Sequence, residues 1–312
     1  MPTVRELTRQ YMPEFPTRYC GTVYTDTTEF MDIGYGDVIA VGGYHYMVLK
    51  DECERRFGIE DPKFWVKRCR ELETGERKIL KLVFYEKFPI RIGSFTIQCH
   101  RSPGKEARIL DLVGSDPRFM HGRSFEDVRG NNVRILDIVF GKRLDLIVQE
   151  LEEDHPTYLR KTLPGILENY IGACEAIDFL HRNRETHGDI RRDHLWVEYE
   201  TGQYRWIDFD YAFGFHENPF GLDMFGLGNI LTFLVGKGDH NPADWPGHNL
   251  TTEDRSIVFG NRVTNLRRLF PDIPEPLNNV LMHFSAGTYV FYEGIEEMLQ
   301  DLRPCVDLLR KC

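Results

Sequence analysis

Residues 187–194 read HGDIRRDH, and residues 207–210 read IDFD. Two short apolar runs lie between them, on either side of Thr201-Gly202, so the pattern predicts a loop, a hairpin and then an acidic turn. Carboxylates at such turns can serve as a base and as metal ligands. Phosphoryl transfer needs both, because positioning and divalent metal supply most of its transition-state stabilisation.

Lys81 stands upstream of this stretch, within the run ILKLV at residues 79–83. Alternation along a strand puts Ile79, Lys81 and Val83 on one face. If that face points inward, the lysine needs an anionic partner, because a buried charge without one is costly. If the faces are exchanged, Lys81 lies in solvent, as most lysines do. The run alone leaves both alternatives open.

Glu106 lies on a predicted helix that begins at Ser102-Pro103, a capping hydroxyl followed by proline in the first turn. It aligns with Leu110 and Val113 at positions i, i+4 and i+7 of that helix. A carboxylate on an apolar stripe indicates a buried partner. The alternative is an ordinary glutamate at the edge of the stripe.

The two halves of the chain differ in their patterns, and the border falls near residues 140–142. The first half predicts strands: 37–39 and 44–49 around Val41-Gly42-Gly43, 64–73 and 77–86 around Thr74-Gly75-Glu76, and 133–140 after a turn at 130–132. The second half predicts helices: 163–180, a buried helix at 221–235, and two more within 274–303.

A strand lysine, a helix glutamate, His-x-Asp and Asp-Phe-x follow one another in the order of the protein-kinase signature set. From about Tyr46 to Arg303 the chain resembles the protein-kinase-like superfamily, and residues 221–228 look like the start of its central helix. The resemblance implies an α+β, bilobal protein-kinase-like fold with a β-rich N-lobe and a helical C-lobe. It also implies three parts: residues 1–50, an N-terminal extension with an extra β-hairpin; 51–140, the N-lobe; and 141–312, the C-lobe.

Asp208 and Asp223 are 15 positions apart, which leaves room only for a shortened activation segment.

The resemblance assigns roles to single residues. Lys81 would hold the phosphates of ATP, with Glu106 orienting it, and Asp189 would be the catalytic base. Asp208 would bind Mg²⁺, and Asp223 would brace the catalytic loop. The adenine would be enclosed by Ile79 and by a hinge at Ile138, Val139 and Phe140.

The chain departs from the family pattern at several positions. His194 stands where the family usually has asparagine, and the lipopolysaccharide sugar kinases look similar in this respect. Imidazole suits softer ions than Mg²⁺, so Mn²⁺ is an alternative metal, and a structural role for His194 also stays open. Asp210 replaces the glycine of Asp-Phe-Gly, as in aminoglycoside and choline kinases, and is a candidate second metal ligand. Of a glycine-rich loop, only Gly58 is present.

With these departures, the resemblance implies an atypical bacterial serine/threonine-kinase-like phosphotransferase. It would move the γ-phosphoryl group of ATP to a hydroxyl of a protein, sugar or small-molecule substrate. One alternative is a pseudokinase that acts as a nucleotide-binding or scaffolding module. A metal-dependent hydrolase would instead use a cluster of His187, Asp189, His194, Asp208 and Asp210. The hydrolase hypothesis leaves Lys81 and Glu106 without a role.

Composition excludes several partners. The net charge of −10 argues against a broad nucleic-acid-binding face. No stretch approaches the roughly 20 apolar residues that a membrane span requires, and residues 1–10 lack a signal-peptide core. The seven cysteines are odd in number and have no C-x-x-C spacing, so we expect reduced thiols in a cytoplasmic protein.

Overall fold

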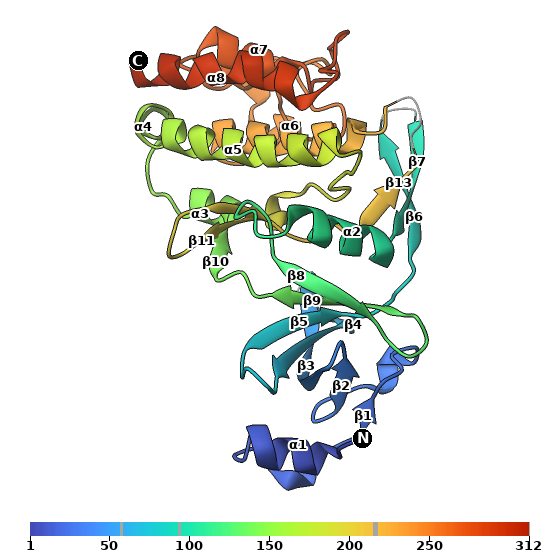
Figure 1. The fold of residues 1–312 in the computed structure, drawn as a ribbon. Coiled ribbons are helices and arrows are strands. Elements are labelled where there is room, and N and C mark those ends of the chain that lie inside the picture. The colour runs from blue at the N-terminus through green and yellow to red at the C-terminus, as the bar shows by residue number, and fades with distance from the viewer. Residues whose placement is uncertain (57–58, 93–94, 215–217, 312) are drawn as a thin grey trace. The chain divides into compact units, whose positions relative to one another are not determined.

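A computed structural model describes residues 1–56, 59–92, 95–214 and 218–311 (Figure 1). Gly58, the remaining glycine of the expected phosphate loop, lies outside these residues. The chain divides into two compact units. The first comprises Met1–Glu86, Arg101–Asp116 and Met120–Val139, and the second comprises Lys87–His100, Pro117–Phe119 and Phe140–Cys312.

The first unit is built on a seven-stranded sheet in the order β1-β2-β3-β4-β5-β9-β8 (Figure 1). Its strands are β1 (Val23–Tyr24), β2 (Val38–Val41), β3 (Tyr44–Arg56), β4 (Ile59–Glu71), β5 (Arg77–Lys81), β8 (Gly122–Glu126) and β9 (Asn132–Asp137). Except for the parallel pair β1–β2, neighbours are antiparallel. Strand β3 is continuous across position 50, so the hairpin β2–β3 and the following strands share one sheet.

Both hairpins expected in this half are present. Val41 pairs with Tyr44, and Gly42 and Gly43 both have positive φ, the backbone conformation that a two-residue hairpin turn requires. In the second hairpin β5 ends at Lys81, five residues before the expected end at position 86. After one further bond, from the Leu82 N–H to the Trp65 carbonyl, the chain leaves the sheet.

Strand periodicity divides the apolar residues of the first unit between two faces of the sheet. One face forms a cluster that includes Ile39, Val48, Leu80 and Leu82. The other carries Val38 and Met47, which pack with residues of α1 (Val4–Tyr11). The helix α1 begins with a capping box between Thr3 and Glu6.

The edge strand β8 is tied across the sheet by Arg123. Its guanidinium donates to the Tyr46 hydroxyl of β3 at 2.9 Å and to the Glu71 carboxylate of β4 at 2.7 Å. It also lies over the Tyr44 ring, 4.1 Å from the centroid. Strand β8 is last in the strand order, whereas β3 and β4 are central. These contacts therefore hold the sheet in a curled shape.

Helix α2 (Pro103–Val113) starts where the sequence predicts. The Ser102 side chain accepts a hydrogen bond from the Lys105 N–H, and Pro103 occupies the first turn. The stripe formed by Glu106, Leu110 and Val113 is buried. The helix contacts β8 and β9, so it covers the end of the sheet that also contains β5.

The second unit is mainly helical. Its helices are α3 (Leu144–Gln149), α4 (His155–Lys161), α5 (Leu163–Arg182), α6 (Gly221–Gly236), α7 (Glu275–Met282) and α8 (Ile295–Lys311). Its strands are β6 (Lys87–Ile92), β7 (Phe95–Arg101), β10 (Gly141–Arg143), β11 (Leu195–Glu198), β12 (Tyr204–Trp206) and β13 (Tyr211–Phe213). Short 3₁₀ turns complete the two units: η1 (Thr17–Tyr19), η2 (Phe30–Asp32), η3 (Arg192–His194), η4 (Pro242–Asp244), η5 (Pro246–His248) and η6 (Leu266–Arg268).

The second unit contains two small sheets, ordered β10-β11-β12 and β13-β7-β6. The hairpin β11–β12 matches the one predicted around Thr201-Gly202. The hairpin β6–β7 was not predicted. Its Ile97 and Cys99 form a small apolar cluster with Phe213 of β13 and Phe225 of α6.

Helix α6 is the buried helix that the sequence predicts. A Cβ atom added at Gly228 would lie 2.3 Å from the Phe284 ring, and one at Gly226 would lie 2.6 Å from Ile190. Gly226 therefore allows a close approach between α6 and the 187–194 loop, and Gly228 allows one between α6 and Phe284. Helix α8 is longer than expected, since it continues through Pro304 to Lys311.

In the described part of the chain, no helix is long and apolar enough to cross a membrane.

Candidate active site

The 187–194 loop, which follows α5, is held by the buried carboxylate of Asp223 on α6. Its Oδ2 accepts the His187 N–H at 2.7 Å, and its Oδ1 accepts the Gly188 N–H at 2.8 Å. The Nε2 atom of His181 lies 3.1 Å from the same Oδ2. Gly188 has φ +82°, a conformation that suits glycine. The contact expected between Asp223 and the loop is thus present.

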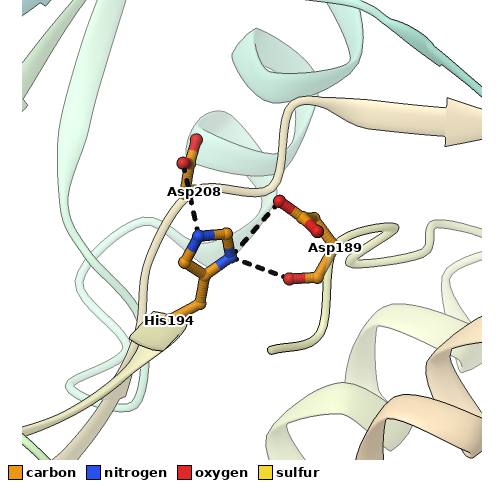
Figure 2. A group of neighbouring side chains, drawn as sticks. All are labelled: Asp189, His194 and Asp208. Carbon is orange, nitrogen blue, oxygen red and sulfur yellow. Dashed lines mark hydrogen bonds and ion pairs between the residues drawn. The ribbon is translucent and has the colours of Figure 1, made fainter. Parts of the chain in front are cut away.

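Asp189, His194 and Asp208 form one group within the second unit (Figure 2). The Nδ1 of His194 lies 2.8 Å from the Asp189 backbone carbonyl and 3.5 Å from its carboxylate. Because a carbonyl can only accept, this bond places a proton on Nδ1. In the neutral ring Nε2 then carries the lone pair, and it lies 3.6 Å from the Asp208 carboxylate.

This arrangement suits a divalent cation. One ligand atom from each of the three residues falls within 4.8 Å of the others. The bond at Nδ1 also fixes the ring tautomer, as in known metal sites. The Asp208 carboxylate and the His194 imidazole are ligands that Mn²⁺ accepts readily, whereas Mg²⁺ favours an all-oxygen shell. Asp210 is fully buried, and one of its carboxylate oxygens lies within 4.8 Å of one of Asp208.

Asp189 lies in an environment that makes it a better proton acceptor than an ordinary aspartate. Burial raises the pKa of Asp189 to about 6, although His194 and Arg191 act in the opposite direction. The neighbouring Asp193 pairs with Arg191 at 2.6 Å, and against the effect of burial this bond lowers the pKa of Asp193 to about 2. Two aspartates in one loop therefore differ strongly in basicity, which suits Asp189 for general-base work.

Arg191 lies in the same loop, and its role was not predicted from the sequence. Besides its bidentate contact with Asp193, its guanidinium lies 3.9 Å from the Asp189 carboxylate. A cation at this distance favours the ionised form of the candidate base. Its spacing from Asp189 in the loop was the signal that could have drawn attention to it.

Asp208 follows β12 and has a positive φ of 65°. A non-glycine residue in this conformation is uncommon, and such residues tend to cluster at functional sites. The next residue, Phe209, is fully buried and packs edge-on against Phe119 and His187. The buried ring anchors the turn, so the backbone at Asp208 is fixed by its neighbour.

Lys81 and Glu106 lie in the first unit and contact each other. The Lys81 side chain is 8% exposed and donates to Glu106 Oε1 at 2.8 Å, while the Glu106 side chain is fully buried. The solvent-facing alternative for Lys81 and the stripe-edge alternative for Glu106 are therefore wrong. A second cation, Arg134 on β9, donates to the other oxygen of Glu106 at 3.2 Å. The role of Arg134 was not predicted from the sequence.

The residues assigned to the adenine site occupy different environments. Ile79 is half-buried on the same face of β5 as Lys81. Ile138 and Val139 follow β9 and are half-buried, while Phe140 is 68% exposed. The border between the two units falls between Val139 and Phe140. Their contact with adenine stays a prediction.

Comparison with known proteins supports the fold alone. No protein-family profile matches the chain, and no curated protein matches it. Among solved structures, the PknI kinase domain of Mycobacterium tuberculosis superposes with a TM-score of 0.50 at 14% identity, covering 86% of this chain and 98% of that domain. A single-residue mutant of the same domain gives the same score and identity, with 97% of its chain covered. The chain therefore has a protein-kinase-like fold, as the resemblance in its sequence implied.

Proposed function

We propose that the protein is an ATP-dependent phosphotransferase that moves the γ-phosphoryl group to a hydroxyl group of its substrate. The buried Lys81–Glu106 pair carries the proposal. Taking a lysine and a glutamate out of water costs several kcal/mol per ion, so such a pair is a poor means of stabilising a sheet. A lysine held in one orientation is useful where it must meet an anion, and in a kinase fold that anion is a nucleotide phosphate.

The remaining roles follow from the second unit. Asp189, with its raised pKa, would accept the proton of the substrate hydroxyl. Asp208 and His194 would hold a divalent cation, with Asp210 as a further candidate ligand. When bound, the cation would neutralise charge on the phosphate oxygens. We propose Mg²⁺, with Mn²⁺ as the alternative that the imidazole favours.

A pseudokinase is the second candidate, and the position of His194 favours it. The ring lies 3.5 Å from the Asp189 carboxylate and 3.6 Å from that of Asp208. An imidazole between the two carboxylates would compete with a metal ion for them. The protein could then bind a nucleotide without turning it over.

We place the protein in the cytoplasm, where ATP is abundant. Six cysteines in the described residues are free thiols, which is compatible with a reducing compartment: Cys20, Cys53, Cys69, Cys99, Cys174 and Cys305.

Nucleotide binding is tested by thermal unfolding with MgATP. A ligand present at 100 times its Kd stabilises the folded state by about 2.7 kcal/mol. We expect this gain in the wild type and its loss in Lys81→Ala. Lys78→Ala is a matched control, because Lys78 lies on the same strand and pairs with Asp137 at 2.7 Å. Equal stabilisation of wild type and Lys81→Ala would exclude Lys81 as the phosphate ligand.

Turnover is tested with two aspartate variants. Asp189→Asn should leave MgATP affinity nearly unchanged and lower turnover by about 100-fold or more, the scale of general-base catalysis. Asp208→Asn should weaken MgATP binding as well. A wild type that binds MgATP but transfers no more phosphate than Asp189→Asn to sugars, lipids and proteins would support the pseudokinase.

A further inference from the structure

Arg134 is fully buried, and in the pairing of β5 with β9 it lies directly opposite Lys81. Its guanidinium donates in three directions: Nε to Glu106 Oε2 at 3.2 Å, Nη2 to the Leu82 carbonyl at 3.2 Å, and Nη1 to the Asn132 carbonyl at 2.8 Å. Glu106 thus accepts from two cations, one at each carboxylate oxygen.

Two like charges directly opposite each other on neighbouring strands are destabilising. The cross-strand pair Lys81–Arg134 is therefore costly unless an anion serves both members, and Glu106 is placed to do so. The guanidinium is planar and rigid, so three acceptors fix its position, whereas an ammonium turns freely on a flexible stem. Arg134 is the fixed donor of the two, and Lys81 is the adaptable one.

We propose that Arg134 is a positioning residue that orients the Glu106 carboxylate, so that Glu106 aims Lys81 at the phosphates before any nucleotide is bound. The inference rests on the proposed function, since it concerns the same lysine. Arg134 itself touches Glu106, the Leu82 carbonyl just after β5 and the Asn132 carbonyl of β9. Its effect on a nucleotide would therefore pass through Lys81.

A double-mutant cycle tests this route, with MgATP as the probe and isothermal calorimetry as the assay. Arg134→Met should weaken MgATP binding about tenfold when Lys81 is present, and less than twofold in a Lys81→Ala background. Adenosine, which has no phosphate, should bind wild type and Arg134→Met with affinities that agree within twofold. Arg134→Lys, which retains the charge but not the three-way fork, should recover part of the MgATP affinity.

Arg123→Met is the matched control, because Arg123 is also an ion-paired arginine of this sheet but contacts Glu71 and Tyr46. It should lower the melting temperature while leaving MgATP affinity unchanged. Equal effects of Arg134→Met with and without Lys81, or parallel losses of adenosine and MgATP affinity, would overturn the proposal in favour of a purely structural role. If Arg134→Met does not fold, the same comparison is made with Arg134→Lys, for which unchanged MgATP affinity overturns it. A wild type that binds no MgATP would refute the proposed function as a whole, a result distinct from these.

Discussion

Asp223→Asn is the perturbation that separates the positioning of the 187–194 loop from the chemistry that we propose for it. The Asp223 carboxylate is fully buried and accepts the N–H groups of His187 and Gly188, one at each oxygen. An asparagine has the same shape but one oxygen, so its NH₂ group would face one of these two donors. One of the two backbone N–H groups would then be left without an acceptor.

The expected loss follows from those two bonds. A hydrogen bond to a charged group contributes about 1.5–3 kcal/mol, and a buried donor left without an acceptor costs about 1–3 kcal/mol. We therefore expect the free energy of unfolding to fall by about 3 kcal/mol in Asp223→Asn. Because a 1 Å displacement of a catalytic group can cost about 100-fold in rate, turnover should fall more steeply than MgATP affinity.

Urea unfolding and a labelled-ATP transfer assay measure the two effects. Glu175→Gln is the control, since Glu175 lies on α5 and forms a surface ion pair with Arg303 at 3.1 Å. Surface pairs contribute at most about 1 kcal/mol, so this variant should resemble the wild type. The reasoning is refuted if Asp223→Asn unfolds at the wild-type urea concentration, or if it loses stability while its turnover remains intact.

Two further predictions concern a candidate metal ligand and a buried carboxylate. His194→Asn should retain the fold and shift metal preference from Mn²⁺ towards Mg²⁺ in activity or binding assays; an unfolded variant, or an unchanged preference, would favour a structural histidine. Burial alone would raise the pKa of Asp127, but bonds from Asn131 and Thr27 more than offset it and lower the pKa from 3.8 to about 2. Since the folded-state pKa is depressed, the ionised Asp127 stabilises the folded state above about pH 4, and this contribution is lost between about pH 4 and 2. Asp127→Asn should therefore lower the free energy of unfolding at pH 7 by about 2 kcal/mol. A difference in urea unfolding between wild type and variant that does not change with pH would contradict this.

Local patterns in the sequence predicted the parts of the fold whose signals are short and periodic. The alternation around Lys81 and the stripe through Glu106 predicted two buried faces, and the contact at 2.8 Å decides between the alternatives left open. The glycine pair Gly42-Gly43 predicted a hairpin turn, because glycine adopts positive φ more readily than other residues. In the structure both glycines have positive φ. The order of the motifs predicted the fold class, which a single motif could not do.

Features that depend on distant partners were not predictable in the same way. The hairpin β6–β7 is an example, since Pro89 interrupts its first strand and its apolar residues pack against β13 and α6, far along the chain. Pro304 is another, because proline normally ends a helix, yet α8 continues beyond it. Cys305, Val306 and Leu309 are buried after that proline, so packing compensates for the missing backbone bond.

Arg134 could not be recognised from the sequence for a related reason. An arginine in a strand is ordinarily exposed, and nothing near Arg134 in the chain indicates an acceptor. Its partner Glu106 lies 28 residues earlier on a helix. Both units thus contain a fully buried carboxylate that accepts donors at each of its oxygens, Glu106 in the first and Asp223 in the second. Burial of an ion is costly for stability, and an acceptor shared by two donors fixes their orientation. The two groups so fixed, the Lys81 ammonium and the loop that carries Asp189, are those to which we assign phosphate binding and proton transfer.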